Sequence, residues 1–418
     1  MATKYFLGTA TAVAQITTMQ VTAYDAGTTY SILVNSIVIA STIAQGSVNA
    51  TATALSTAWN ASTHPWATPI TASAATDTVT LTADTAGVPY TVTTSESGGA
   101  GTIGDPSITT ASAGANDWST ALNWSDSAVP AGGDTVILAN NSVNICWGLA
   151  QSAVTLAELR IEKTYTGKIG LDWKVFATSI NGETTVSTKH EYRATYLAVS
   201  ATLLNVGQHF GPGNPNGSSR IKIDLGSNAS TATIFGTAQS PSETGLGAVR
   251  LKNVHATSEI HVRSAPGGVS LAGDVPGETS TVSLVSVSDQ TTASRVMIGS
   301  GVTITTYRQD GGTNVLQAAA TVTTVTVNGG TLTMEGDYTV TTGNVNDGTV
   351  IDNHIKTAAA AWTTLNHNGG TIDVQQSNRT RTWTTLNLSN KGTLKADGSI
   401  LTVTTLNDRS GKYTLTAS

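Results

Sequence analysis

The clearest pattern in this chain is a recurring order of apolar and polar positions in its last quarter. Each copy starts with an apolar residue and two threonines, passes through a few mostly apolar or Asn positions, and reaches a glycine-rich turn. The first threonines occupy positions 305, 323, 341, 363, 384 and 404, so the copies are 18, 18, 22, 21 and 20 residues apart. β-branched residues favour strands, glycine favours turns, and units this short bury an apolar face only by stacking. The pattern predicts a β-solenoid (β-helix) with coils of roughly 20 residues.

The repeat also predicts which side chains face the solenoid interior. Counted from the residue before the two threonines, positions three and five, such as Val325 and Val327, alternate to one face and are expected to point inward. The leading residue would then point outward, unless a corner in the strand buries it, and both arrangements are open at this point. An outward apolar row needs a partner and predicts a homotrimer packed along it. These interface candidates are Val322, Val340, Trp362, Trp383 and Val403.

The first part of the chain has a different pattern and predicts a small α+β domain over residues 1–95. Residues 47–60 place apolar side chains on one face at helical spacing, and Ser47 is suited to cap that helix. Strands are expected on either side of the helix, at 14–24, 29–39, 78–83 and 88–93. We expect it to be an anchoring domain.

Glycine content and the regularity of the repeats divide the rest of the chain into three parts. Glycines mark residues 96–117 as a linker, residues 118–303 predict an irregular β-solenoid with loop insertions, and residues 304–418 predict the regular repeats. Trp118 and Trp124, at the start of the irregular part, are expected to cover the otherwise open end of the solenoid core. At about 20 residues per coil, the solenoid would contain roughly fifteen coils.

One insertion stands out as a candidate binding loop. Residues 207–219 contain four glycines and two prolines, which predicts a surface loop. Loops that leave a rigid scaffold are where binding commonly resides, so this loop is a candidate binding loop. Its candidate contact residues are His209, Phe210, Asn214 and Asn216.

Composition narrows the function further. The net charge is −6, so nothing steers this chain toward nucleic acid or an anionic membrane. The most apolar run, 32–44, is too short to span a bilayer, and the first residues make a poor signal peptide. The single cysteine, Cys146, cannot form an internal disulfide. We therefore expect a soluble protein made in a cytoplasm.

No motif of high specificity for catalysis or cofactor binding occurs in the sequence. The histidines lack metal-binding spacing, and the glycine-rich phosphate motifs are missing, so we expect no cofactor and no metal. Paired carboxylates on one solenoid face would indicate a glycan-cleaving enzyme. The carboxylates considered for this role are Glu335, Asp337, Asp347, Asp352 and Asp373. Because carboxylates at turns commonly cap backbone amides, we expect a structural role for them and no enzyme.

Two stretches resemble phage virion proteins. Residues 29–35 together with 79–92 are similar to a small domain that recurs in phage tail and capsid-associated proteins, and residues 118–136 resemble the start of β-solenoids in phage fibres and bacterial surface proteins. The resemblance implies a virion structural protein, assembled in the host cytoplasm. Within that class we expect a capsid decoration or cement protein that braces neighbouring subunits. Its partners would be further copies of itself, the major capsid protein or other virion proteins, and a host surface glycan.

Two alternatives remain open from the sequence. One is a tail fibre or tailspike that binds a receptor or cleaves a polysaccharide, which a paired-acid site on one solenoid face would favour. The other is a secreted bacterial adhesin, which a signal peptide in the full gene would favour.

Overall fold

The computed structural model describes most of the chain. The described residues are 2–172, 176–180, 183–189, 192–208, 217–226, 228–238, 247–272, 278–288, 295–317, 321–336, 338–354, 360–375, 380–389, 392–396, 401–409 and 414–416.

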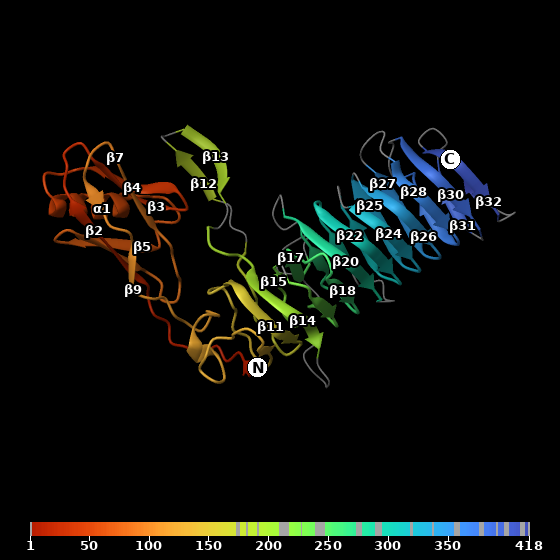
Figure 1. Ribbon diagram of the computed structural model, residues 1–418, viewed down its shortest axis with the longest axis horizontal. Helices are drawn as coiled ribbons and strands as arrows, with labels where there is room; N and C mark the ends of the chain where they lie inside the picture. Colours follow the sequence, from red (N-terminus) through yellow and green to blue (C-terminus); the bar gives the residue numbers. More distant parts are fainter. Residues whose placement is uncertain are drawn as a thin grey trace.

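The chain forms a small α+β unit and a parallel β-solenoid (Figure 1). The solenoid makes about 9 turns between residues 135 and 408, and its strands belong to one 23-stranded sheet. The predicted fold class, mainly β with an N-terminal α+β part followed by a β-solenoid, is confirmed.

Two stacks of strands run along the solenoid, and each strand pairs in parallel with the strand one coil later. The first stack contains β1 (Thr3–Tyr5), β10 (Thr135–Leu138), β11 (Ala150–Glu162), β14 (Leu197–Gln208), β16 (Thr231–Ile234), β18 (Glu259–Val262), β20 (Ser280–Val287), β22 (Val302–Gln309), β24 (Thr321–Val327), β26 (Thr339–Val345), β28 (Ala360–His367), β30 (Arg381–Leu388) and β32 (Leu401–Asp408). The second contains β15 (Ile221–Asp224), β17 (Val249–Lys252), β19 (Val269–Leu271), β21 (Val296–Ile298), β23 (Thr313–Leu316), β25 (Thr331–Gly336), β27 (Thr349–His354), β29 (Gly370–Asp373), β31 (Gly392–Lys395) and β33 (Thr414–Thr416).

The coils between β14 and β20 are longer than the later ones. Leu203 of β14 pairs with Thr231 of β16, 28 residues later, whereas Thr306 of β22 pairs with Thr324 of β24, 18 residues later. Between β11 and β14 the chain also forms an antiparallel hairpin, β12 (Phe176–Ile180) and β13 (Glu183–Lys189). The early coils therefore use more chain per turn, and the expected number of roughly fifteen coils was wrong.

The row of leading apolar residues lies in the core. In the pairing of β22 with β24, Ile304 lies opposite Val322 and Thr306 opposite Thr324, while the first threonine of each pair is skipped. The strand bends at that threonine, so Val322 and Val325 both face inward and are fully buried. The same burial applies to the other interface candidates Val340, Trp362 and Trp383, and Val403 packs partly buried against the same core. The prediction that the leading residues point outward was wrong, and the alternative, in which a corner in the strand buries them, is confirmed. The apolar outer stripe on which the homotrimer was based therefore does not exist.

A buried charged pair lies inside the C-terminal coils. The side chains of Asp352 and Arg381 have no solvent exposure, and Arg381 Nη1 lies 2.8 Å from Asp352 Oδ1. Trp362 Nε1 donates to the other carboxylate oxygen at 3.2 Å. Burial, with the Asp352 carboxylate adding to it, raises the pKa of the buried Tyr338 phenol well above its ordinary value. The ion pair and the indole hydrogen bond therefore join residues of neighbouring coils.

Two asparagine ladders run along the outside of these coils. In one, Asn346 Nδ2 donates to Asn328 Oδ1 at 2.8 Å and Asn368 Nδ2 donates to Asn346 Oδ1 at 2.9 Å. The second ladder joins Asn344, Asn366, Asn387 and Asn407. Because side chains alternate between faces, a slip by one residue would break every rung, so the ladders fix the register of the strands.

The N-terminal unit contains two sheets and one helix. One sheet has β5 (Ile70–Ala75), β6 (Thr78–Ala83), β2 (Ile16–Ala23), β8 (Thr102–Ile103) and β9 (Ser107–Thr110); the other has β4 (Ile37–Ile43), β3 (Thr29–Val34) and β7 (Thr93–Ser97). Helix α1 (Val48–Ala61) begins where Ser47 accepts a hydrogen bond from Ala50 N, and its buried Trp59 joins the unit's own core. The strand expected at 88–93 starts only at Thr93, and the expected linker 96–117 contains β8 and β9.

The N-terminal unit is inserted into the first coil of the solenoid. Strand β1 precedes that unit in the chain and pairs with β10, with Thr3 opposite Thr135. Ala2 N donates to Asp134 Oδ1 at 2.8 Å, and the buried Lys4 donates Nζ to Asp126 Oδ2 at 2.6 Å. The start of the chain therefore belongs to the solenoid, which differs from the expected domain boundary at residue 1.

The tryptophans that were expected to close the solenoid core do so. Trp118 and Trp124 are buried, and their rings contact each other edge to face with centroids 4.7 Å apart. The ring of Phe6, which follows β1, has its centroid 5.4 Å from that of Trp124. Phe6 and both tryptophans belong to the solenoid core. Aromatic rings cover more apolar area per residue than any other side chain, which suits them to the end of a stack.

Candidate functional site

A cleft lies between the N-terminal unit and the first coils of the solenoid. This interdomain cleft has a volume of about 520 Å³, and a second cavity of about 370 Å³ shares its central residues. The cleft is lined by the β3–β4 turn, the segment before β7, residues 146–151 of the solenoid and residues 192–194, which follow the β12–β13 hairpin.

Two chain crossings join the unit to the solenoid beside the cleft. Val13 N donates to Ala113 O at 2.8 Å, so the outgoing and returning segments form an antiparallel bridge. Gly87 N donates to Val13 O at 3.0 Å, which attaches a loop of the unit to the same bridge. A Cβ atom on Gly114 would lie 3.3 Å from Gly87 Cα, so glycine allows this close approach.

Arg193 makes a third connection, which passes through the cleft. Its guanidinium carbon lies 4.5 Å from the centre of the Trp147 ring in the solenoid and 5.1 Å from the Tyr192 ring. Arg193 Nη1 donates to Pro89 O of the N-terminal unit at 3.1 Å. Tyr192 in turn packs against Trp66 of that unit, with ring centres 5.1 Å apart. Stacked guanidinium groups of this kind contribute about 0.5–2 kcal/mol per ring, so the contacts orient both Arg193 and the two parts of the chain.

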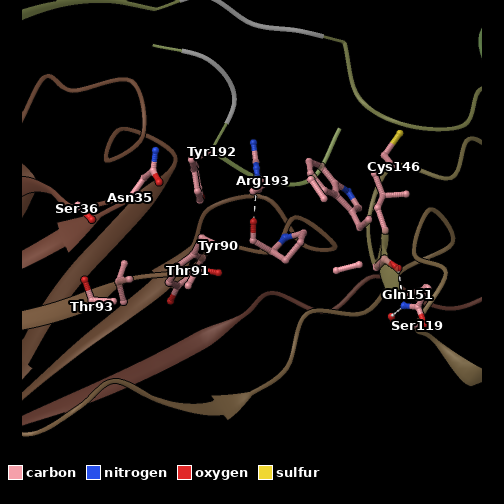
Figure 2. A pocket seen from close by; sticks show the side chains of 17 residues that line it. Asn35, Ser36, Tyr90, Thr91, Thr93, Ser119, Cys146, Gln151, Tyr192 and Arg193 are labelled. Carbon is pink, nitrogen blue, oxygen red and sulfur yellow. Dashed lines mark hydrogen bonds between the residues drawn. The ribbon is translucent and has the colours of Figure 1, made fainter. Parts of the chain in front are cut away.

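Polar groups line the cleft on both sides of Arg193. Figure 2 shows Asn35 and Ser36 on one side, Thr91 below, and Ser119 with Gln151 on the opposite side. Asn35 and Ser36 have φ angles of 49° and 63°, the backbone of a tight hairpin turn. Gln151 Nε2 donates to Ser119 Oγ at 2.9 Å and to Gly148 O at 2.7 Å, which fixes its amide group.

Most of the side chains that line the cleft are neutral. Among the described residues that line the cleft and the second cavity, Arg193 is the only charged one. Burial raises the pKa of the Cys146 thiol and of the Tyr90 phenol, so both are neutral at neutral pH. The cleft therefore presents aromatic faces and neutral hydrogen-bonding groups, while Arg193 is engaged with Pro89 and with the two rings.

The sequence-predicted site residues do not come together in this cleft. The loop candidates His209, Phe210, Asn214 and Asn216 lie outside the described residues, so their prediction stays a prediction. The interface candidates lie in the solenoid core, as described above.

The carboxylates considered for catalysis occupy separate surroundings. Asp352 is paired with Arg381 in the core, and Asp373 is largely buried with Lys395 Nζ at 3.9 Å. Asp347 caps the backbone of a turn by accepting from Gly348 N at 2.7 Å. Glu335 lies opposite Asn353 in the second stack, and Asp337 is outside the described residues.

Comparisons with protein families, with curated proteins and with solved structures return no match for this chain. Within the described ranges, no three His, Cys, Asp or Glu side chains gather to hold a metal ion. None of the helices among those residues is long and apolar enough to cross a membrane.

The sequence did not reveal the residues that build the cleft. Trp147, Tyr192 and Arg193 belong to no recognisable motif, and their partners Pro89 and Trp66 are distant in sequence. The available signal was the adjacency of Tyr192 and Arg193 in a chain with only 5% aromatic and 11% charged residues. This adjacency marks the two residues as unusual, but the sequence does not reveal which segments they contact.

Proposed function

We propose that this chain is a structural protein of a phage virion, placed on the capsid surface as a decoration protein. The observation that carries the proposal is the insertion of the N-terminal unit into the first coil, where β1 and β10 pair across it. A unit joined by two chain crossings and by Arg193 transmits force to the solenoid without a loose linker. The resemblance of residues 29–35, 79–92 and 118–136 to virion proteins supports the same role.

In this role the N-terminal unit binds the capsid and the solenoid extends from it. Parallel strands paired over about 9 turns, with a continuous apolar core, make a stiff body suited to spanning neighbouring subunits. The proposal includes no stoichiometry, because the stripe that suggested a homotrimer is part of the core.

The test is localisation of the chain in purified particles of the phage that carries its gene. Antibodies raised against the full-length chain would be applied to particles, followed by electron microscopy and by mass spectrometry of the particle proteins. We expect labelling over the capsid. Labelling at the tail would replace this proposal with the tail-fibre alternative, and absence from the particles would refute both.

A further inference from the structure

We propose that Asn328 and Asn368 are sites of spontaneous deamidation, and that the ladder they form with Asn346 holds this modification back while the coils stay paired. Each of the two asparagines is followed by a glycine. Neither the reaction nor its restraint depends on where in a particle the chain lies.

Two structural demands bring asparagine and glycine together at these positions. Asparagine supplies the amide of the ladder rung. Glycine is required next, because a Cβ atom on Gly329 would lie 2.6 Å from Asp310 O. A Cβ atom on Gly369 would lie 2.5 Å from Asn346 O. Asn-Gly is the sequence most prone to deamidation, since glycine has no side chain to shield its backbone nitrogen, so the same features that build the ladder create a labile bond.

Deamidation has geometric requirements that the ladder opposes. The backbone nitrogen of the glycine attacks Cγ of the preceding asparagine, and an N–C bond forms. The proton of that N–H passes to the departing Nδ2, which leaves as ammonia. Water then opens the resulting succinimide ring and leaves an aspartate or an isoaspartate. The reaction therefore needs a side-chain amide that can turn toward its own backbone and a glycine nitrogen that can approach it.

The ladder holds each of the two side-chain amides from both sides. Asn328 Nδ2 donates to Asp310 Oδ1 at 2.7 Å, and Asn328 Oδ1 accepts from Asn346 Nδ2 at 2.8 Å. Asn368 Nδ2 donates to Asn346 Oδ1 at 2.9 Å, and Asn368 Oδ1 accepts from Ser389 Oγ. Each amide is bonded to the coil before it and to the coil after it, so it must break two hydrogen bonds to reach its own backbone.

The attacking nitrogen is also held at the second site. Gly369 N donates to Val345 O at 3.2 Å, beside the 2.8 Å bond from Asn368 N to the same oxygen. The middle rung, Asn346, is followed by Asp347 and not by glycine. Asn346 therefore links the two labile positions without being a third one.

The modification would break the rung that restrains it. In Asn328 the Nδ2 donor would become a carboxylate oxygen that faces Asp310 Oδ1, and like charges placed opposite each other on a sheet are destabilising. In Asn368 the same change would remove the donor to Asn346 Oδ1. Once one site has reacted, the neighbouring coils should therefore open more readily.

The test follows deamidation by peptide mapping with mass spectrometry while the full-length chain is incubated at mildly alkaline pH. The same chain in guanidinium chloride gives the rate without the ladder. Asn346→Ala removes one hydrogen bond from each site, and Ser389→Ala removes one from Asn368 alone. Asn344→Ala is the matched control, because Asn344 is a rung of the second ladder in the same coil as Asn346.

We expect both sites to react at least about tenfold more slowly in the folded chain than in denaturant, since the loss of each hydrogen bond corresponds to about a factor of five. Asn346→Ala should accelerate both sites about fivefold, and Ser389→Ala should accelerate Asn368 alone by about the same factor. Asn344→Ala should leave both rates within about twofold of the parent.

Equal rates in the folded and the denatured chain would overturn the proposal, as would unchanged rates in Asn346→Ala. Equal acceleration by Asn344→Ala, or acceleration of Asn328 by Ser389→Ala, would show that the coils loosen as a whole, and would overturn the assignment of the protection to the ladder.

Discussion

Replacing Arg381 by methionine tests how the buried charged pair contributes to the C-terminal coils. Methionine keeps much of the length of arginine, so the substitution removes charge with little change in volume. It leaves the Asp352 carboxylate without its 2.8 Å ion pair, while the 3.2 Å hydrogen bond from Trp362 remains. Breaking a fully buried pair by removing one partner costs about 3–5 kcal/mol.

A local measurement suits this variant, because the chain has two separate cores and a single global unfolding midpoint is not well defined. Hydrogen exchange with mass spectrometry reports the opening free energy of individual segments. For Arg381→Met we expect exchange in β28 and β30 to accelerate by roughly a hundredfold to a few thousandfold, since each 1.4 kcal/mol corresponds to tenfold. The N-terminal unit should exchange at the parent rate.

The double variant Asp352→Asn/Arg381→Met is the control, since it removes both charges. It should recover most of the protection that Arg381→Met loses, because no uncompensated charge remains in the core. If Arg381→Met left exchange in β28 and β30 unchanged, or if the double variant were as unprotected as the single one, the assignment of this cost to an unpaired carboxylate would be refuted.

Three further variants test other parts of the fold. Burial lowers the pKa of His367 below its usual value near 6.5, so below that pH the unfolded chain binds a proton more readily than the folded chain. The thermal stability of the C-terminal coils should therefore fall as pH drops below about 6.5, and His367→Leu should reduce this dependence on pH. An equal dependence on pH in both proteins would contradict the argument. Gly343 leaves room for the Trp362 ring, and a Cβ there would also lie 2.8 Å from Leu365 Cδ1; Gly343→Val should lower the opening free energy of β26 and β28, measured by hydrogen exchange, by at least ~1–3 kcal/mol, whereas Asn344→Val on the outer face should lower it less. Trp118→Ala should lower the opening free energy of the first coils by ~3–5 kcal/mol and accelerate hydrogen exchange only there. Equal acceleration along the whole solenoid would show that Trp118 does not stabilise the first coils alone.

The sequence predicted the repeats because their signal is local. Valine, threonine and glycine recur at the positions that strands and turns require, and the strand pairings follow that period. Trp118 and Trp124 were predictable for a similar reason, since large aromatic residues just before a stack have few other uses. The direction of the Trp362 side chain, inward or outward, was not predictable. It depends on a bend at one threonine, and the strict alternation of inward and outward side chains along a strand does not reveal such a bend.

Features that join distant segments were hidden from the sequence. The pairing of Thr3 with Thr135 places the start of the chain in the solenoid, although nothing in β1 names its partner. The cleft has the same character, because Asn35, Pro89, Trp147 and Arg193 come from four separate stretches. Sequence reasoning found the elements here but not the contacts between them.

The insertion of the N-terminal unit imposes an order on biosynthesis. Strand β1 leaves the ribosome before its partner β10, which is made more than a hundred residues later. During that interval the unit can complete its own sheets and helix, which brings the two ends of the intervening segment together at the Val13–Ala113 bridge. The entropy cost of closing the long loop between β1 and β10 has then been met before β10 is made. The nascent chain can therefore begin to stack solenoid coils on a β1 strand that is already held near its partner.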